Sequence, residues 1–213
     1  HDAGAEVIGV GTGIEDAPPP GLVPRNCDLS DRAAIESLLD DLEDRRIDIL
    51  VNNAGIIRRA PVADHALSDW DDVMAVNLDA PFILCRALGA KMAARGHGKI
   101  VNVASVLSFE GGLFVHGYAA SKAALANLTR SLANEWAAKG VNVNAVAPGY
   151  VATDNTAALR LDPDRERALM DRVPLGRWLT PEEIAKPVLF LVSDEASAIH
   201  GTVLPVDGGW LAR

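Results

Sequence analysis

The alternation of short β-branched runs with helical patterns is the feature that most restricts the fold of this chain. Continuous apolar runs occupy residues 47–53, 98–105 and 141–148, and helical patterns separate them. Continuous Val and Ile runs indicate strands buried on both faces, and parallel strands need crossover connections, usually helices. We therefore predict an α/β fold, a doubly wound, Rossmann-like parallel sheet that forms a single domain over residues 1–213.

Local signals place the remaining elements. Further strands are expected at residues 5–10, 22–29 and 201–209. Helices are expected to start at Ser30, Ser68, Tyr118 and Pro181, and to end near residues 44, 94, 139 and 191. The polar segment 153–172 is expected to form a short helix or a lid over the substrate. Ligands of such sheets bind beyond the carboxyl ends of the strands, so the loops after Val51, Ala104 and Ala147 should hold the site.

Charge and composition exclude several classes of protein. The chain carries 29 acidic and 20 basic residues, a formal net charge of −9, which opposes binding to nucleic acid. No apolar run reaches transmembrane length and no charged-then-apolar leader opens the chain, so no membrane role is expected. Cys27 and Cys85 are expected to be buried free thiols in a reducing cytoplasm. None of the five histidines has metal-ligand spacing, and no metal is expected.

Three polar features fall on the predicted loops. The sequence "NNAG" occupies residues 52–55, Ser105 ends the next strand, and "YAASK" places Tyr118 and Lys122 at i and i+4 on one helical face. A phenol has a pKa near 10, and a fixed ammonium nearby favours phenolate and lowers that pKa. Tyr118 is then able to exchange a proton with an alcohol or carbonyl oxygen, to which Ser105 donates a hydrogen bond. A polarised carbonyl beside a nicotinamide is the arrangement for hydride transfer.

Each of these features has an ordinary explanation when it stands alone. A Tyr–Lys pair on a helix is usually a solvated pair, a serine at a strand end is usually a cap, and "NNAG" is usually a turn. All three occur here in this order, each at the carboxyl end of a predicted strand. Their combination is far more specific than any one of them.

The combination resembles the short-chain dehydrogenase/reductase family. The resemblance rests on "NNAG", Asn77 in "VNL", Ser105, "YAASK" and "PGYVAT", and it covers essentially the whole chain. It implies that Tyr118 is the proton donor or acceptor, that Ser105 orients the substrate, and that Lys122 lowers the Tyr118 pKa and binds the nicotinamide ribose. It implies that Asn77 holds a water that links Lys122 to solvent. Asn77 has the alternative of simply kinking a helix.

The same resemblance implies further cofactor contacts and an assembly. Asp28 would contact the adenine, although it has the alternative of capping the turn into Ser30. The other implied contacts are Asn53, Ala54 and Gly55 for the adenine ribose and backbone, and Pro148, Gly149, Val151 and Thr153 on the nicotinamide side. Members of the family are usually homotetramers, and the helices expected at residues 69–94 and 118–138 are candidates for the interfaces.

Within the family, five segments are similar to members that act on sugar acids such as 2-deoxy-D-gluconate or 2-dehydro-3-deoxy-D-gluconate. These segments are "NNAGIIRR", "ASVLSFEGG", "NEWA", "APGYVATDNT" and "VDGGWLAR". A carboxylate in a closed pocket needs a cation, and arginine offers the best geometry. The candidate substrate residues are Arg58, Arg59 and Arg177 for the carboxylate, and His116 and Tyr150 for hydroxyls. Trp178 and Trp210 are more often packing or subunit contacts. The alternatives are a reductase of a 3-oxoacyl thioester or of 5-ketogluconate, and a non-catalytic dinucleotide-binding relative or fragment.

The glycines near the N-terminus are not the phosphate-binding turn that they first resemble. Gly9, Gly11 and Gly13 follow an apolar run, but no helical pattern follows them. The resemblance places them at the end of the family's second strand, where the adenine ribose is bound. The family's first strand and glycine-rich turn are absent from these residues, and we expect the working enzyme to have them upstream. Glu15 and Asp16 would repel the 2′-phosphate of NADP, so NAD is the expected cofactor.

Overall fold

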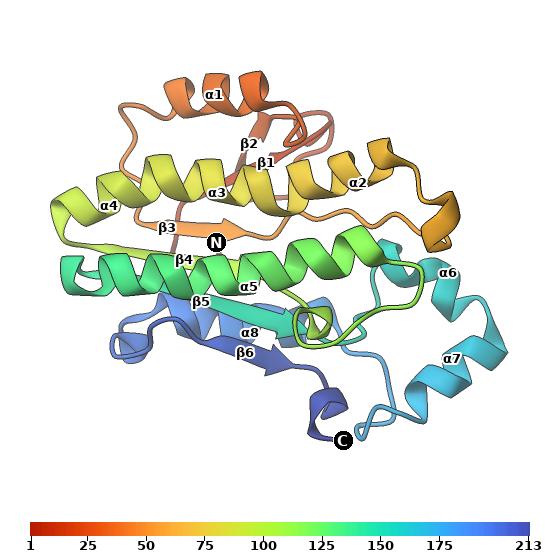
Figure 1. Ribbon diagram of the computed structural model, residues 1–213. Helices are drawn as coiled ribbons and strands as arrows, with labels where there is room; N and C mark the ends of the chain where they lie inside the picture. The colour runs from red at the N-terminus through yellow and green to blue at the C-terminus, as the bar shows by residue number, and fades with distance from the viewer. The chain divides into compact units, whose positions relative to one another are not determined.

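The computed structural model describes residues 1–213, apart from the side chain of Ala158. The chain forms two compact units, His1–Arg46 and Ile47–Arg213. In the N-terminal unit, β1 (Val7–Gly11) and β2 (Leu22–Asn26) pair in parallel and α1 (Arg32–Asp41) follows them (Figure 1). Within the described residues these two strands pair only with each other.

The start of α1 differs from the sequence-based prediction by one residue. Asp31, not Ser30, is the N-cap, and its side chain accepts a hydrogen bond from the backbone N–H of Ala33. Ser30 instead donates two hydrogen bonds to Asp28 Oδ1, from its backbone nitrogen at 2.9 Å and from its hydroxyl at 2.7 Å. The Asp28 side chain closes a turn that removes Ser30 from the capping position, so the prediction of a Ser30 cap was wrong.

The larger unit contains a four-stranded parallel sheet with helices on both faces. Its strands are β3 (Ile49–Asn52), β4 (Gly98–Val103), β5 (Val141–Pro148) and β6 (Val203–Val206), in the order β3-β4-β5-β6. Figure 1 shows the long helices from α2 to α5 on one face of this sheet and α8 on the other. The parallel, doubly wound α/β architecture predicted from the sequence is therefore confirmed.

The alternation of side chains along β5 explains how the two helical layers are held. Ala145 and Ala147 pack with Ala104 and with Ala126 of α5 (His116–Trp136). Val146 packs on the opposite face with Leu191 of α8 (Pro181–Val192). Successive side chains of a strand point to opposite faces, so a fully buried strand is apolar throughout. The small alanines allow α5 to approach the sheet closely, which brings its first turns to the carboxyl ends of β4 and β5.

A single long helical segment, Leu67–Arg95, runs beside α5. It consists of α2 (Leu67–Met74), α3 (Ala80–Leu84) and α4 (Ala90–Arg95), joined by π-helical turns at Ala75–Asp79 and Cys85–Gly89. It begins at Leu67 with no side-chain cap, one residue before the predicted Ser68. By length and composition this helix could cross a membrane, so the prediction that no apolar run is long enough was wrong. Its buried side chains lie in the core of the larger unit, as those of long core helices also do.

The remaining helices follow the predicted pattern more closely. α5 begins two residues before Tyr118 and continues through a 3₁₀ turn to Lys139. The segment 153–172 forms a 3₁₀ turn, α6 (Ala157–Arg160) and α7 (Pro163–Met170). α8 starts at Pro181 as predicted, and the Thr180 side chain caps it.

Gly140 is a position where we expect an alanine to be costly. Gly96 and Gly140 both have φ of 75°, a left-handed conformation that costs an alanine about 1–2 kcal/mol. A Cβ at Gly96 would meet no atom, whereas a Cβ at Gly140 would overlap the carbonyl oxygen of Gly96. Gly140→Ala should therefore lower the free energy of unfolding by about 1–3 kcal/mol more than Gly96→Ala. Urea unfolding of both variants measures this difference, and equal losses would show that no clash exists.

Candidate active site

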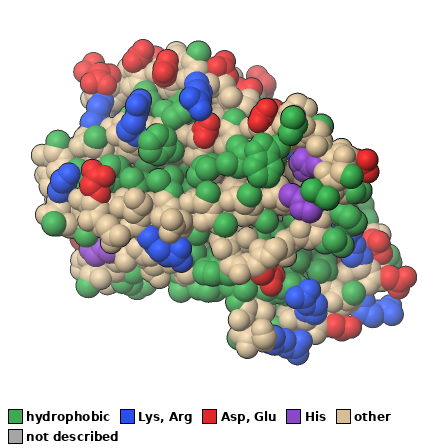
Figure 2. Space-filling model, in the orientation of Figure 1, with side chains coloured by type: hydrophobic (Ala, Val, Ile, Leu, Met, Phe, Trp, Pro, Cys, Tyr) green, Lys and Arg blue, Asp and Glu red, His purple; other side chains and the backbone are tan. Residues whose placement is uncertain are grey.

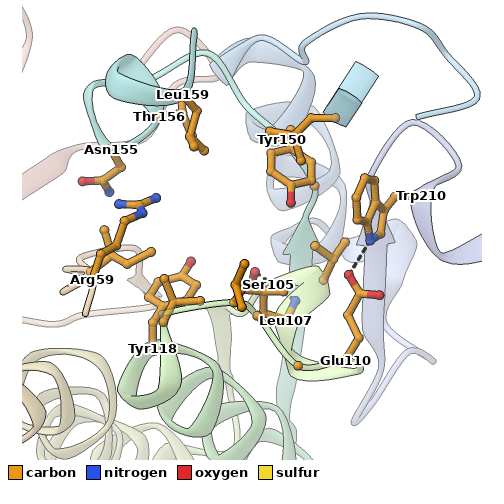
Figure 3. Close-up of a pocket in the computed structure, with 18 of the residues that line it drawn as sticks. Arg59, Ser105, Leu107, Glu110, Tyr118, Tyr150, Asn155, Thr156, Leu159 and Trp210 are labelled. Atoms are coloured by element: carbon orange, nitrogen blue, oxygen red, sulfur yellow. Dashed lines mark hydrogen bonds between the residues drawn. The ribbon is translucent and has the colours of Figure 1, made fainter. Parts of the chain in front are cut away.

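A cavity of about 390 Å³ lies beyond the carboxyl ends of β4 and β5 in the larger unit (Figure 3). Its walls come from the loop after β4, the first turn of α5, the end of β5, and the segment 153–172. Ser105, Tyr118 and Tyr150 line it, together with Trp210 from the last 3₁₀ turn. The position matches the edge of the sheet that the sequence pattern indicated.

Ser105 and Tyr118 meet in this cavity. Ser105 lies two residues after the end of β4. Between them, Ala104 still pairs with β5, because its nitrogen donates a hydrogen bond of 2.8 Å to the Val146 carbonyl. The Ser105 hydroxyl accepts a hydrogen bond of 3.1 Å from the Leu107 backbone nitrogen. The Ser105 side chain also lies near enough to the phenol of Tyr118 to lower its pKa. The structure thus brings together two of the four residues that the family resemblance names as catalytic.

The pKa of Tyr118 differs from the expectation. Burial raises it above the ordinary value, while the Ser105 side chain and the positive charge of Arg59 lower it. Lys122 was expected to lower this pKa, but its Nζ lies 5.8 Å from the Tyr118 ring centroid and bonds elsewhere. In the protein alone, Arg59 is the cation that lowers the pKa of Tyr118, and the role expected for Lys122 stays a prediction.

Lys122 is buried beside the loop that follows β3. Its Nζ donates a hydrogen bond of 2.7 Å to the Val103 carbonyl, and burial lowers its pKa to about 8. A Cβ at Gly55 would lie 3.3 Å from this Nζ and 3.4 Å from Asn77 Oδ1. An ammonium has three donors, so two remain beside the backbone of Gly55. Donors of this kind fit the hydroxyls of a ribose.

Asn77 holds the loop that follows Gly55. Its Oδ1 accepts a hydrogen bond of 2.8 Å from the Ile56 nitrogen, and its Nδ2 donates to the Ile56 carbonyl at 3.0 Å and to Ser121 Oγ at 3.1 Å. Asn77 is fully buried and lies in the first π-helical turn of the long helix. Such turns are common at functional sites because they turn a side chain away from the regular helical position. Asn77 therefore holds the backbone of Ile56, the residue directly before Ile57 in the cavity lining.

The other expected cofactor residues lie on three segments. Asn53 and Ala54 are exposed after β3, next to Asn52, which is buried and bonded to Asn102 at 2.8 Å. The residues expected on the nicotinamide side lie at the end of β5 and directly after it: Pro148 is its last residue, and Gly149, Val151 and Thr153 follow. Gly149 is close to β6, where a Cβ would lie 2.8 Å from Asp207 Cα. Asp28 belongs to the N-terminal unit, and the hydrogen bonds from Ser30 lower its pKa.

The substrate residues expected from the sequence divide into two groups. Tyr150 and Arg59 line the cavity, while Arg58, Arg177 and His116 are not part of its lining. Arg58 lies 3.5 Å from both Asp69 and Asp72, and Arg177 forms a 2.8 Å ion pair with Glu183, whose pKa it lowers to about 2. His116 lies edge-on to His65, with 6.1 Å between the ring centroids.

Four charged or aromatic residues of the lining were not predicted as substrate contacts. They are Glu110, Arg165, Arg172 and Trp210. Trp210 had been interpreted as a packing or subunit contact, and it does pack, with Val106 and Val173. The sequence does contain a pattern that groups the two arginines, because positions 165, 169 and 172 have the spacing of one helical face.

Comparisons with known proteins agree with this geometry. A family model described as Enoyl-(Acyl carrier protein) reductase, of the short-chain dehydrogenase/reductase type, matches residues 12–211. The 2-dehydro-3-deoxy-D-gluconate 5-dehydrogenase of Pseudoalteromonas atlantica is 49% identical over 100% of this chain and 88% of its own length.

Two solved structures share both fold and sequence. A candidate NAD(P)-dependent gluconate 5-dehydrogenase from Beutenbergia cavernae, with bound NADP, is 50% identical with a TM-score of 0.95, covering 100% of this chain and 89% of its own. A gluconate 5-dehydrogenase from Burkholderia cenocepacia, in complex with NADP and tartrate, is 36% identical with a TM-score of 0.94, covering 100% and 88%. The chain belongs to the short-chain dehydrogenase/reductase family, as an oxidoreductase that acts on CH–OH groups with a nicotinamide dinucleotide.

Proposed function

We propose that this enzyme transfers a hydride between NAD(H) and the hydroxyl or ketone of a sugar acid, such as 2-deoxy-D-gluconate or 2-dehydro-3-deoxy-D-gluconate. The observation that carries the proposal is the charge of the cavity beside Ser105 and Tyr118. Among the described residues that line it, three guanidinium groups oppose the single carboxylate of Glu110. A small cavity with an excess of positive charge suits a hydroxylated acid. The sugar-acid names of the relatives support the same class of substrate.

Different residues carry out proton transfer, substrate orientation and cofactor binding in the proposed reaction. In the direction of oxidation, the Tyr118 phenolate accepts the hydroxyl proton of the substrate while Ser105 donates a hydrogen bond to the same oxygen. The bound nicotinamide supplies the acceptor for the hydride that leaves the carbinol carbon, which becomes a carbonyl carbon. Lys122 donates its two remaining hydrogen bonds to the ribose hydroxyls, and Asn77 keeps the neighbouring loop in place.

The segment 153–172 is proposed to be the substrate lid of a single oxidoreductase domain that spans residues 1–213. Asn155, Thr156 and Leu159 from this segment line the cavity, as do three residues from its second half. Asn53, Ala54, Gly55, Pro148, Gly149, Val151 and Thr153 are proposed to contact the cofactor in the larger unit, and Asp28 to contact the adenine. Arg58, His116 and Arg177 remain candidates for contacts outside the present cavity lining, and Tyr150 for contacts within it.

NAD is the proposed cofactor in preference to NADP. Glu15 is fixed at the end of β2, because its carboxylate accepts hydrogen bonds from the Asn26 backbone at 3.3 Å and side chain at 3.0 Å. Arg25, the nearest cation along the chain, donates to the Pro24 carbonyl at 2.8 Å. A fixed carboxylate beside the end of β2 disfavours a 2′-phosphate. Two relatives of known structure hold NADP, so the comparison of kcat/KM for the two cofactors is decisive. A tenfold preference for NADP would overturn this part of the proposal.

We also infer that the enzyme is a cytoplasmic homotetramer that binds neither nucleic acid nor a membrane. Figure 2 shows apolar side chains along the face where the long helix and α5 lie. Leu67, Trp70 and Phe82 of the long helix are among the exposed apolar residues. An apolar face of this kind suits association with further copies of the chain. The net charge of −9 supports the absence of nucleic acid.

A substrate panel at fixed cofactor tests the proposed function. We expect the highest kcat/KM with a six-carbon sugar acid or its ketone, because only such substrates combine hydroxyls with a carboxylate that suits the positive cavity. The panel should include 5-ketogluconate, which belongs to the same class of sugar acids, and a 3-oxoacyl thioester, which is the substrate of a different class of reductase. A higher kcat/KM with the thioester would contradict the assignment to sugar acids. A change in NADH fluorescence on mixing with the protein checks cofactor binding independently of turnover.

A further inference from the structure

The cavity has two chemically different ends. In Figure 3, Arg59 and Trp210 lie on opposite sides of the cavity, and Ser105 and Tyr118 lie between them. Tyr150 lies on the Trp210 side, where the two ring centroids are 4.8 Å apart. A substrate that reacts at Tyr118 therefore extends toward one end or the other.

Arg172 is held at the Trp210 end by stacking. Its guanidinium carbon lies 3.9 Å from the centroid of the Trp210 ring. Trp210 is itself buried, and its Nε1 donates a hydrogen bond of 2.5 Å to Glu110. A stacked guanidinium keeps its N–H groups pointing outward in its own plane, where a carboxylate is able to accept two of them. Within the part of the chain that the structure describes, the Arg172 side chain makes no hydrogen bond and no ion pair.

Arg165 faces the same cavity from the lid helix. Residues 165, 169 and 172 all line the cavity and follow the spacing of one helical face along α7 and its end. The position of α7 is fixed by the neighbouring Glu166, which accepts a 2.7 Å hydrogen bond from Trp178 Nε1. Arg58 and Arg177, by contrast, are neutralised by carboxylates and are outside the cavity lining.

The three arginines of the cavity lower the pKa values of the two tyrosines to different extents. Burial raises the pKa of Tyr150, and among the cations that lower it Arg172 has the largest effect, followed by Arg165 and then Arg59. Arg59 is the cation that lowers the pKa of Tyr118. Arg172 thus acts at the Tyr150 end, where it stacks on Trp210, while Arg165 also lies within electrostatic range of Arg59.

On the basis of the proposed function, we propose that Arg172, stacked on Trp210, binds the substrate carboxylate at the end of the cavity remote from Tyr118. A carboxylate bound at Arg59 instead would lie near Tyr118, where its negative charge would disfavour the phenolate. The remote position leaves Arg59 free to favour that phenolate. The reacting carbon is then several bonds from the carboxylate, as C5 of a six-carbon sugar acid is and C2 or C3 is not.

Arg172→Gln tests the carboxylate subsite. We expect kcat/KM for the best sugar acid of the substrate panel to fall ten- to a hundredfold, since charged hydrogen bonds are lost. The kcat/KM for the uncharged alditol of the same carbon number should change less than threefold. Arg172→Lys should recover part of the loss, because it keeps the charge without the planar fork. Arg167→Gln is the matched control, because Arg167 belongs to α7 but is absent from the cavity lining.

The outcomes separate this inference from the proposed function. Equal losses on the acid and the alditol, or no loss on the acid, would overturn the subsite while the proposed function stands. A wild-type enzyme that turns over no sugar acid would overturn both. The position of the new carbonyl, read by NMR of the product, is a second test. A carbonyl at C5 supports the orientation, and one at C2 or C3 contradicts it.

Discussion

Replacing Tyr118 with Phe should lower kcat by about a thousandfold, because a positioned proton donor or acceptor contributes about 10²–10⁴-fold to such reactions. Tyr118 is the phenol at which the cavity, the Ser105 side chain and the Arg59 charge converge. The phenylalanine ring keeps the packing of the first turn of α5, so the far-ultraviolet circular dichroism and the unfolding midpoint should stay close to those of the wild type. Steady-state assays with the best substrate of the panel measure the loss.

The chain offers a matched control, since it contains only two tyrosines. Tyr150 also lines the cavity, but its ring packs edge-on against Trp178 and Trp210. Tyr150→Phe should change KM more than kcat and should lower kcat less than tenfold, because no proton leaves the substrate there. If Tyr118→Phe kept near-normal turnover, or if both variants lost kcat equally, the assignment of the proton to Tyr118 would be wrong.

Lys122→Met should lower kcat/KM by about a hundredfold or more and should also change how stability depends on pH. The catalytic loss follows from the donors that Lys122 is proposed to offer to the ribose, each charged hydrogen bond contributing about 1.5–3 kcal/mol. Methionine has a similar length and no charge, so the variant fills most of the same buried space. Cofactor affinity measured by fluorescence titration should weaken in parallel with turnover.

The pH effect follows from the burial of the ammonium. The pKa of Lys122 is lowered to about 8 in the folded protein, against about 10.4 in an unfolded chain. Between these values the unfolded state binds more protons, so the contribution of Lys122 to the free energy of unfolding rises with pH. Below pH 8 the wild type bears the full cost of burying the charge, and the variant bears none.

The comparison that checks this is the difference in unfolding free energy between wild type and Lys122→Met at two pH values. From pH 7 to pH 10 the difference should shift by about 2 kcal/mol in favour of the wild type. Other titrating groups are common to both proteins and cancel in the difference. A difference that is constant over this range would show that Lys122 is not held as a buried cation.

The sequence was sufficient for the sheet and for the centre of the site, because both depend on local signals. Continuous apolar runs predict buried parallel strands, and the residues directly after each strand lie at one edge of the sheet. Ser105 and Tyr118 are close in sequence and meet as predicted. The Ser30 cap failed for an equally local reason, since the preceding Asp28 takes the Ser30 hydroxyl for its own turn.

The arginines at the Trp210 end of the cavity could not be predicted from sequence patterns. Arg58 and Arg59 are neighbours, yet only the fold shows that the first faces Asp69 and the second faces the cavity. The same holds for Arg172 and Arg177, of which the second is occupied by a carboxylate. Which arginine of such a pair is free depends on contacts made by distant segments, and no local pattern encodes those contacts.

The hydrogen bonds between Asn77 and Ile56 have a consequence for how the family diverges. The amide of Asn77 holds the backbone nitrogen and carbonyl of Ile56, and therefore places no demand on the Ile56 side chain. The backbone path of the loop is held by a helix residue 21 positions further along the chain, so the side chains of the loop are not needed to hold it. Ile57, the residue after Ile56, lines the cavity and can then be exchanged in a descendant protein without disturbing Asn77 or Lys122. Substrate preference is thereby free to drift while the apparatus for hydride transfer is inherited unchanged.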